Sequence, residues 1–120
     1  MIMEKKRIGD FGEEAACRYL IKQNYIIRER NFRMKCGEID IIAYDTDGCQ
    51  VFVEVKTRKN TNFGYASEYV NAAKQQKLKN TALLYCGEGE YMRFDIIEVY
   101  YQERDNTMYV EKINHIKDAF

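Results

Sequence analysis

The sequence predicts an α/β fold of element order αβββαββ, in which a mixed five-stranded sheet carries one helix on each face. Apolar residues recur with helical spacing in two segments, 8–23 and 67–86, and favour strands in five others. The second helix separates the third strand from the fourth, and such a connection makes a right-handed crossover to a parallel strand. The other strands follow one another closely and are expected to pair antiparallel. At 120 residues the chain, 1–120, is expected to form a single domain.

The first helix is expected over residues 8–23, where small and apolar residues form one continuous stripe. This stripe consists of Ile8, Phe11, Gly12, Ala15, Ala16, Tyr19 and Leu20. Glu13 borders the stripe, whereas Glu14 points outward and has Arg18 four residues later as a surface partner. Glu13 is therefore the carboxylate that reaches inward, or else a solvated residue on the flank of the helix.

Three strands are expected next, over 25–33, 37–44 and 50–57, and the last two form a hairpin around a turn that contains Asp47-Gly48. The period of two in a strand separates the two faces of this hairpin. Its buried side is expected to consist of Ile39, Ile41, Ala43, Val51, Val53 and Val55.

Charged residues interrupt both apolar runs of the hairpin. Asp40 stands between two isoleucines, and Glu54 stands between two valines. Pairing around the turn brings Asp40 close to opposite Glu54, within one or two residues of register. Lys56 follows two residues after Glu54 and shares its face. The hairpin therefore places two carboxylates and one ammonium together.

The second half of the chain supplies further cationic residues. The segment 57–66 is basic and carries two aromatic residues, a composition found where nucleic acid binds and also in ordinary surface loops. The second helix is expected over 67–86, with Ser67 as its N-cap and Gly87 as its terminator.

The inward stripe of this second helix is expected to consist of Val70, Ala73, Lys74, Lys77, Leu78, Thr81, Leu84 and Tyr85. Lys74 and Lys77 either extend past the helix edge to solvent or face the acidic cluster and meet a phosphate. Strands over 91–101 and 108–113, joined by a turn at 103–106, complete the sheet.

Charge is segregated along this neutral chain. Residues 36–55 carry no basic and five acidic residues, whereas 56–79 carry six basic and one acidic, and 1–35 carry nine basic and five acidic. An acidic hairpin between basic segments suits a site that binds cations on its carboxylates and polyanions around them; random clustering of solvated charge gives the same counts.

Cysteine usage and hydropathy favour a cytosolic protein. Cys17, Cys36, Cys49 and Cys86 form no CxxC pair and follow no apolar leader, so reduced thiols are expected. A zinc site made from Cys36, Cys49, Cys86 and His115 stays open as an alternative. No apolar run is long enough to span a membrane.

Two adjacent carboxylates repel each other unless a proton or a cation neutralises them. Mg²⁺ or Mn²⁺ does so with oxygen ligands, and Asp40, Glu54 and the carbonyl of Val55 would form such a set. Lys56 would then position an attacking water or stabilise a developing phosphorane, which is the chemistry of phosphodiester hydrolysis. The alternative is a cross-strand salt bridge of Lys56 with the two carboxylates, without catalytic function.

Several motifs together resemble the YraN-like family of small bacterial proteins over nearly the whole chain. They are Gly9-x-x-Gly12-Glu13, Asn31-Phe32-Arg33, Gly37-Glu38-Ile39-Asp40, Val51-Phe52-Val53-Glu54-Val55-Lys56-Thr57-Arg58, Phe63-Gly64, Lys74-Gln75-Gln76-Lys77-Leu78, Arg93-Phe94-Asp95, His115-Ile116 and Ala119-Phe120.

That family in turn resembles the PD-(D/E)XK nuclease superfamily, particularly Holliday-junction resolvases, which implies a restriction-endonuclease-like fold. The resemblance makes Asp40 the aspartate of the motif, Glu54 and Lys56 its ExK pair, and Glu13 a fourth catalytic residue that adds a carboxylate to the metal site. Ile39 replaces the proline of the motif.

The leading hypothesis is therefore a Mg²⁺-dependent endonuclease acting on DNA rather than RNA, on branched or single-stranded structures. Arg58, Lys59, Lys74 and Lys77 would bind phosphates, and the resemblance implies a homodimer because a junction is two-fold symmetric. The alternatives are a module that binds nucleic acid or docks a partner without turnover, and a purely structural charge cluster.

Overall fold

The structure, a computed structural model, describes residues 2–59, 70–87 and 91–120 and confirms the predicted element order. Of the basic segment predicted at 57–66, residues 60–66 lie outside this description. The elements are α1 (Ile2–Lys22), β1 (Ile26–Met34), β2 (Gly37–Tyr44), β3 (Gln50–Lys59), α2 (Ala72–Cys86), β4 (Met92–Arg104) and β5 (Thr107–Ile116).

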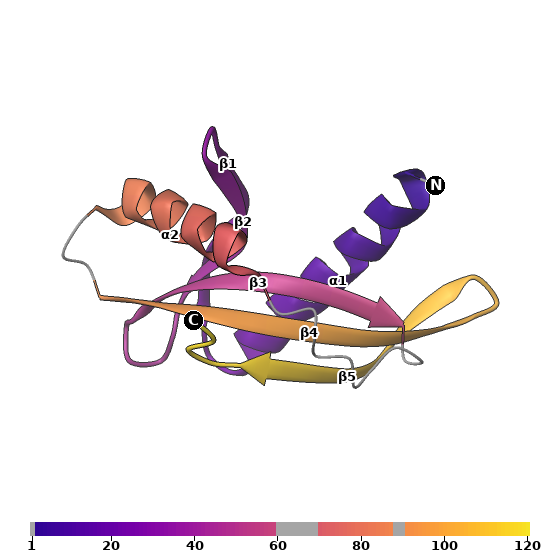
Figure 1. Cartoon of the computed structure of the whole chain (residues 1–120). Coiled ribbons are helices and arrows are strands. Elements are labelled where there is room, and N and C mark those ends of the chain that lie inside the picture. Colours follow the sequence, from indigo (N-terminus) through magenta and orange to yellow (C-terminus); the bar gives the residue numbers. More distant parts are fainter. Residues whose placement is uncertain (1, 60–69, 88–90) are drawn as a thin grey trace.

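The five strands form one mixed sheet in the order β1-β2-β3-β4-β5. β3 and β4 are parallel, and every other neighbouring pair is antiparallel. Figure 1 shows α2 on one side of the sheet beside the β1–β2 hairpin, and α1 crossing the other side. The crossover through α2 is what allows β3 and β4 to run parallel, as predicted.

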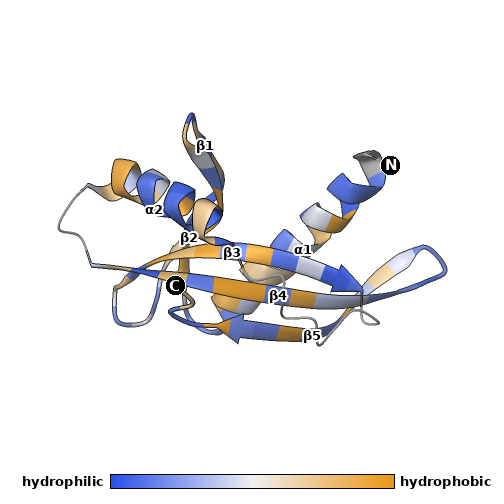
Figure 2. Cartoon of the chain, in the orientation of Figure 1, coloured by the Kyte–Doolittle hydropathy of each residue, from blue (hydrophilic) through white to orange (hydrophobic). Residues whose placement is uncertain are grey.

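Each helix covers its own hydrophobic core. On the α1 side the buried residues are Ala16, Cys17, Leu20, Tyr25, Ile41, Ala43, Val51, Val53, Ile97 and Val99. On the α2 side they are Ile39, Ile42, Phe52, Val70, Leu78, Ala82, Phe94 and Ile96. β4 supplies both cores and is buried from residue 94 to residue 101, and Figure 2 shows hydrophobic stretches along it that are interrupted by hydrophilic positions.

The prediction that Ile39 lies on the same side as Ile41 is wrong. Ile41 packs under α1, whereas Ile39 packs under α2. The backbone pairing of β2 with β3 ends at Ile41 and Val53. Beyond this point β2 leaves β3 and rises with β1 beside α2 (Figure 1), so the simple alternation of faces is lost.

α2 begins later than predicted. It begins at Ala72, and the side chain of Asn71 caps it by accepting a hydrogen bond from the backbone N of Lys74 at 2.9 Å. The predicted start at Ser67 is therefore wrong, and Ser67 itself lies outside the described residues. Gly87 ends the helix as predicted, with φ 83, a conformation that favours glycine.

The predicted inward stripe of α2 is partly wrong, because Leu84 is 63% exposed and Ala73 is also exposed. The buried residues of this helix are Leu78, Thr81 and Ala82.

α1 begins at Ile2 rather than residue 8, and ion pairs of Lys6 with Asp10 and of Arg7 with Glu4 support its first turns. Within the described ranges, no helix has the length and hydropathy needed to cross a membrane.

Candidate functional site

Asp40 and Glu54 lie together at the point where β2 separates from β3. The paired residues end at Ile41 and Val53, so Asp40 and Glu54 occupy the next position of the same register. There the carboxylate of Asp40 replaces a backbone partner: its Oδ2 accepts a hydrogen bond from the backbone N of Val55 at 2.8 Å. The register thus brings the two carboxylates together as the sequence predicts.

The carboxyl of Asp40 has a strongly perturbed proton affinity. Burial and the neighbouring charge of Glu54 raise its pKa from 3.8 to about 7. The hydrogen bond from Val55 and the positive charge of Lys74 act in the opposite direction but are outweighed. Near neutral pH, Asp40 is therefore poised between its protonated and ionised forms, and a cation that binds there competes with a proton.

Glu54 is paired with Lys74 across the gap between β3 and α2. The Nζ atom of Lys74 lies 2.6 Å from Oε1 of Glu54, whose side chain is only 8% exposed. Lys74 belongs to the first turn of α2, so the inward orientation considered from the sequence is the observed one. Its contact in this structure is a carboxylate.

Lys56 lies on the same face of β3 as Glu54, two residues further along the strand. Its side chain is half-buried. Within the part of the chain that the structure describes, its ammonium forms no hydrogen bond or ion pair, in contrast to Lys74. Lys56 is thus a cation beside Glu54 that is not already neutralised by a described carboxylate.

Glu13 approaches β3 from α1, at the point where this helix crosses the strand. Gly12 makes this approach possible, because a methyl group at its Cα would overlap the side chain of Thr57 in β3. Glu13 is buried, and burial raises the pKa of its carboxyl although Arg30, whose Nε lies 3.6 Å from Oε1, opposes the shift. Its Oε1 has no hydrogen-bond donor among the described residues.

The negative charge of Glu13 repels the ionised carboxylate of Asp40 and thereby contributes to its raised pKa. Glu13 also lines an open hollow of about 560 Å³, together with Arg7 and Arg30. Nevertheless, among the residues described, no three Asp, Glu, His or Cys side chains gather closely enough to hold a metal ion. The two carboxylates of Asp40 and Glu54, with oxygen from the backbone and from water, are the donor set that remains for a hard divalent cation.

The residues predicted to bind phosphates occupy different settings. Arg58 is 10% exposed, and its Nε lies 3.5 Å from Oε2 of Glu98 in β4. Lys59 is exposed at the end of β3, and Lys77 is exposed on α2. Lys74 and Lys77 line one hollow of about 360 Å³. Lys59 and Lys77 are thus open to a ligand, whereas Arg58 is directed at a buried carboxylate.

The sequence reasoning missed Glu98, which is buried and also accepts a hydrogen bond from Nδ2 of Asn114 at 2.7 Å. Glu98 is in register with Lys56 and therefore extends the polar face of Glu54 onto β4. The signal was present in the sequence, because Glu98 interrupts an apolar run as Asp40 and Glu54 do.

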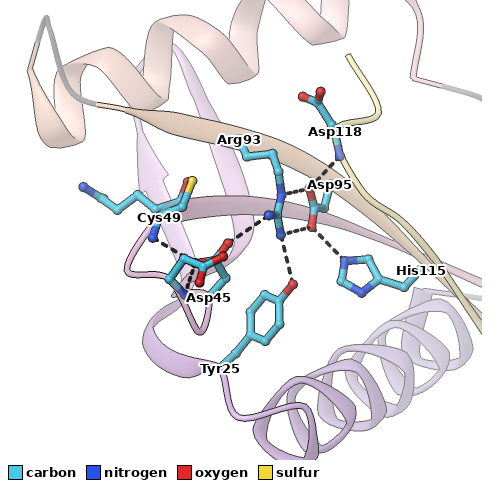
Figure 3. Close-up of polar contacts among 9 residues, drawn as sticks. Tyr25, Asp45, Cys49, Arg93, Asp95, His115 and Asp118 are labelled. Carbon is cyan, nitrogen blue, oxygen red and sulfur yellow. Dashed lines mark hydrogen bonds and ion pairs between the residues drawn. The ribbon is translucent and has the colours of Figure 1, made fainter.

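A second polar network, centred on Asp95 and Arg93 of β4, was also missed (Figure 3). Asp95 is fully buried, and both of its oxygens accept hydrogen bonds from Arg93, at 2.9 and 3.0 Å. His115 of β5 and the backbone N of Asp118 also contact this carboxylate, at 2.7 and 2.9 Å. Although burial acts to raise the pKa of Asp95, these contacts lower it.

Arg93 extends the network to the other end of the hairpin. Its Nη1 donates to Asp45 and its Nη2 to the hydroxyl of Tyr25, both at 2.9 Å. The hydroxyl of Tyr19 lies 3.0 Å from Nδ1 of His115. Every member is already partnered within the protein, so the network connects elements of the fold.

The zinc alternative is wrong for the residues described. Cys36, Cys49, Cys86 and His115 belong to no group able to hold a metal ion. His115 is directed at Asp95, and Cys36 lies 3.2 Å from the hydroxyl of Thr81. None of the four cysteines forms a disulfide.

Fold and site together define a class of small mixed α/β proteins with a pair of carboxylates, one buried and one half-buried, where two strands separate, and with lysines beside it. The model of the family described as "Uncharacterised protein family UPF0102" matches residues 12–99, and the chain belongs to this family. This finding confirms the predicted YraN-like family, and the matched range includes all the predicted site residues.

Related UPF0102 proteins cover the chain almost completely. One from Caldanaerobacter subterraneus subsp. tengcongensis is 47% identical, with 98% of each chain covered. One from Caldicellulosiruptor bescii is 46% identical, covering 98% of this chain and 100% of its own. One from Clostridioides difficile is 43% identical over the same shares.

Proposed function

We propose that the protein is a cytosolic, divalent-metal-dependent nuclease that hydrolyses phosphodiester bonds of DNA in branched or single-stranded structures. The observation that supports this most is the carboxylate pair of Asp40 and Glu54, held at the separation of β2 and β3 by the hydrogen bond from Val55. Two neighbouring carboxylates, one buried and one half-buried, repel each other and cost a fold stability, whereas a site for a hard cation uses such a pair.

Asp40, Glu54 and the carbonyl of Val55 would hold Mg²⁺ or Mn²⁺. Glu13, predicted as a further metal ligand, does not gather with the other two carboxylates into one group, and it would contribute its negative charge from α1. When bound, such an ion neutralises charge on the phosphodiester and makes a water more acidic. Lys56 would orient the attacking water and stabilise the charge of the phosphorane, because its ammonium shares the face of Glu54. Lys59 and Lys77 would contact flanking phosphates.

The protonation of Asp40 sets the pH at which this site works. With a pKa of about 7, Asp40 ionises only near and above neutral pH. Metal binding requires the ionised carboxylate, so metal affinity and cleavage should both fall as pH decreases through this value.

The test is cleavage of junction, flap, single-stranded and duplex DNA, with RNA counterparts, in Mg²⁺ or Mn²⁺. Asp40→Asn, Glu54→Gln and Lys56→Met should lower the cleavage rate by at least about a hundredfold, the usual scale for removing one catalytic group. Glu111→Gln on β5 and Lys22→Met at the end of α1 are matched controls with exposed side chains. Activity that survives in the Glu54→Gln and Lys56→Met proteins would disprove the nuclease.

The ion pair of Lys74 with Glu54 favours a second candidate function, a non-catalytic module that binds nucleic acid or docks a partner. In that case Lys74 is the permanent counter-ion of Glu54 and no metal is needed. This alternative predicts DNA binding that weakens with salt, does not depend on Mg²⁺ or Mn²⁺, and survives Asp40→Asn. Calorimetry that detects a Mn²⁺ site lost in Asp40→Asn would exclude it.

A further inference from the structure

Lys74 occupies the place beside Glu54 that a cation of the site would take. Its ammonium lies 2.6 Å from Oε1 of Glu54. The positive charge of this ammonium also acts on Asp40, where it favours the ionised carboxylate. The Glu54 side chain is 8% exposed and the Lys74 side chain 44% exposed. The carboxylate is therefore fixed in the protein, whereas the long lysine side chain reaches it from the solvent side.

The helix that carries Lys74 does not favour a cation at this position. Lys74 lies in the first turn of α2, which contains no acidic residue, and the N-terminal end of a helix carries partial positive charge. Its backbone N is already capped by Asn71. Glu54 thus provides the main attraction that holds the ammonium in place, and a stronger cation on Glu54 would release it.

A hollow beside the N-terminal end of α2 could accommodate the released ammonium of Lys74. Lys74 lines the hollow of about 360 Å³ that Glu38, Asn71 and Lys77 also line, at the N-terminal end of α2. The carboxylate of Glu38 is paired with Arg33, whose Nε lies 3.2 Å from its Oε2. Two ammonium groups beside the positive end of a helix form a favourable setting for a phosphate. In the contact with Glu54, one of these two charges is neutralised.

We infer that Lys74 is a tethered counter-ion which a divalent cation displaces from Glu54, so that metal binding delivers the Lys74 ammonium to a phosphate of the nucleic acid. This inference rests on the proposed function and makes Lys74 a phosphate-binding residue whose charge couples two binding events. Metal on the carboxylates should strengthen phosphate binding in the hollow, and phosphate there should strengthen metal binding by the same factor.

The first test is calorimetric titration of Mn²⁺ into the intact protein and its Lys74→Met variant. Removal of the competing ammonium should tighten Mn²⁺ binding roughly five- to tenfold, the scale of one partly buried ion pair. Lys79→Met removes a lysine charge from the same helix, away from the hollow, and should change Mn²⁺ affinity by less than about twofold. Equal or weaker Mn²⁺ binding by Lys74→Met than by the unmodified protein would overturn the inference.

The second test observes the ammonium itself. In ¹⁵N-edited spectra of lysine side chains, the Lys74 signal, identified by its loss in Lys74→Met, should shift as Mg²⁺ is added. A non-cleaving Ca²⁺ complex should bind single-stranded DNA more tightly than the metal-free protein, and Lys74→Met should lose this gain. A Lys74 signal unaffected by a saturating concentration of Mg²⁺ would also overturn the inference.

The two proposals fail in different ways. If the unmodified protein binds Mn²⁺ through Glu54, as judged by loss of binding in Glu54→Gln, but Lys74→Met binds it equally, only the counter-ion role is wrong. If neither protein binds Mn²⁺, the metal site itself is wrong and the counter-ion role is wrong with it.

Discussion

At the scale of single residues, Asp40 determines much of the chemistry of the site. Its carboxylate substitutes for a backbone partner at the end of the β2–β3 pairing and lies beside Glu54. In the absence of metal this arrangement costs stability whenever both carboxylates are ionised. Burial first, and the charge of Glu54 second, raise the pKa of Asp40 from 3.8 to about 7, so ionisation of this carboxyl destabilises the folded state.

Asp40→Asn should stabilise the metal-free protein at about pH 8 by roughly 1–3 kcal/mol, because each unit of pKa shift corresponds to about 1.4 kcal/mol and the site is partly open. The folded state binds the Asp40 proton more tightly than the unfolded state, so stability falls as pH rises from 3.8 to about 7. The amide retains an acceptor for the N–H of Val55.

Chemical denaturation of both proteins across this pH range measures the effect, and the difference should nearly vanish at about pH 3, where Asp40 is largely protonated in either state. Glu111→Asn, an exposed carboxylate on β5, is the control. A gain in stability that does not depend on pH would show that repulsion at Asp40 is not its cause.

At the scale of elements, the close crossing of α1 over β3 positions Glu13. Gly12 lies directly against Thr57, so the helix reaches β3 without a side chain between them. Gly9, one turn earlier on the same helix, has no heavy atom near the position of its missing Cβ. The two glycines therefore differ in their tertiary surroundings although both are helical.

Gly12→Ala should destabilise the protein by about 1–3 kcal/mol, because the new methyl group forces α1 away from β3. Gly9→Ala is the matched control and should stabilise by about 0.5–1 kcal/mol, since alanine favours helix. Thermal unfolding of the two variants gives the comparison, and Thr57→Ala combined with Gly12→Ala should recover part of the loss. Equal effects of the two substitutions would mean that the crossing is not close-packed.

At the scale of the whole molecule, the network of Arg93 and Asp95 ties distant parts of the chain together. It joins Tyr25 after α1, Asp45 of the hairpin turn and His115 of β5 through two residues of β4. Because these groups are buried and mutually partnered, losing one leaves the others desolvated without compensation.

Asp95→Asn should lower the free energy of unfolding by about 3–5 kcal/mol, since it removes the fully buried counter-charge of Arg93 and leaves Asp45 as the remaining carboxylate partner of the guanidinium. The pKa of Asp95 is lowered in the folded state, so its contribution is present above the pKa of the unfolded state and lost as pH falls. Urea denaturation at neutral and acidic pH measures this. Asp10→Asn, on an exposed carboxylate paired with Lys6, should change stability by less than about 0.5 kcal/mol.

Metal binding should also appear as whole-molecule stability. A saturating concentration of Mn²⁺ should raise the Tm of the unmodified protein, because a ligand that binds only the folded state stabilises it by about 2.7 kcal/mol at a hundred times its Kd. Chelation should reverse the rise, and Glu54→Gln should abolish it. A rise that persists in Glu54→Gln would place the ion elsewhere on the protein.

Much of the site was predictable because its parts are local. The Asp47-Gly48 turn and two alternating runs were enough to set Asp40 beside Glu54, and the period of two put Lys56 on the same face. The settings of Arg58 and Lys74 were not predictable to the same degree. Each of these cations pairs with a carboxylate in another element. The distance between two elements depends on their packing, which cannot be derived from a single sequence.

The sequence by itself determined the order of the elements, the mixed sheet and the position of the carboxylate pair, because hydrophobic period and turn chemistry act between near neighbours. The tertiary structure decided that Ile39 packs in a different core from Ile41 and that α2 begins at Ala72. It also decided that Arg93 and Asp95 of β4 join Tyr25, the hairpin turn and β5. These outcomes depend on how β2 separates from β3 and how the helices pack, which involve contacts between residues distant in sequence.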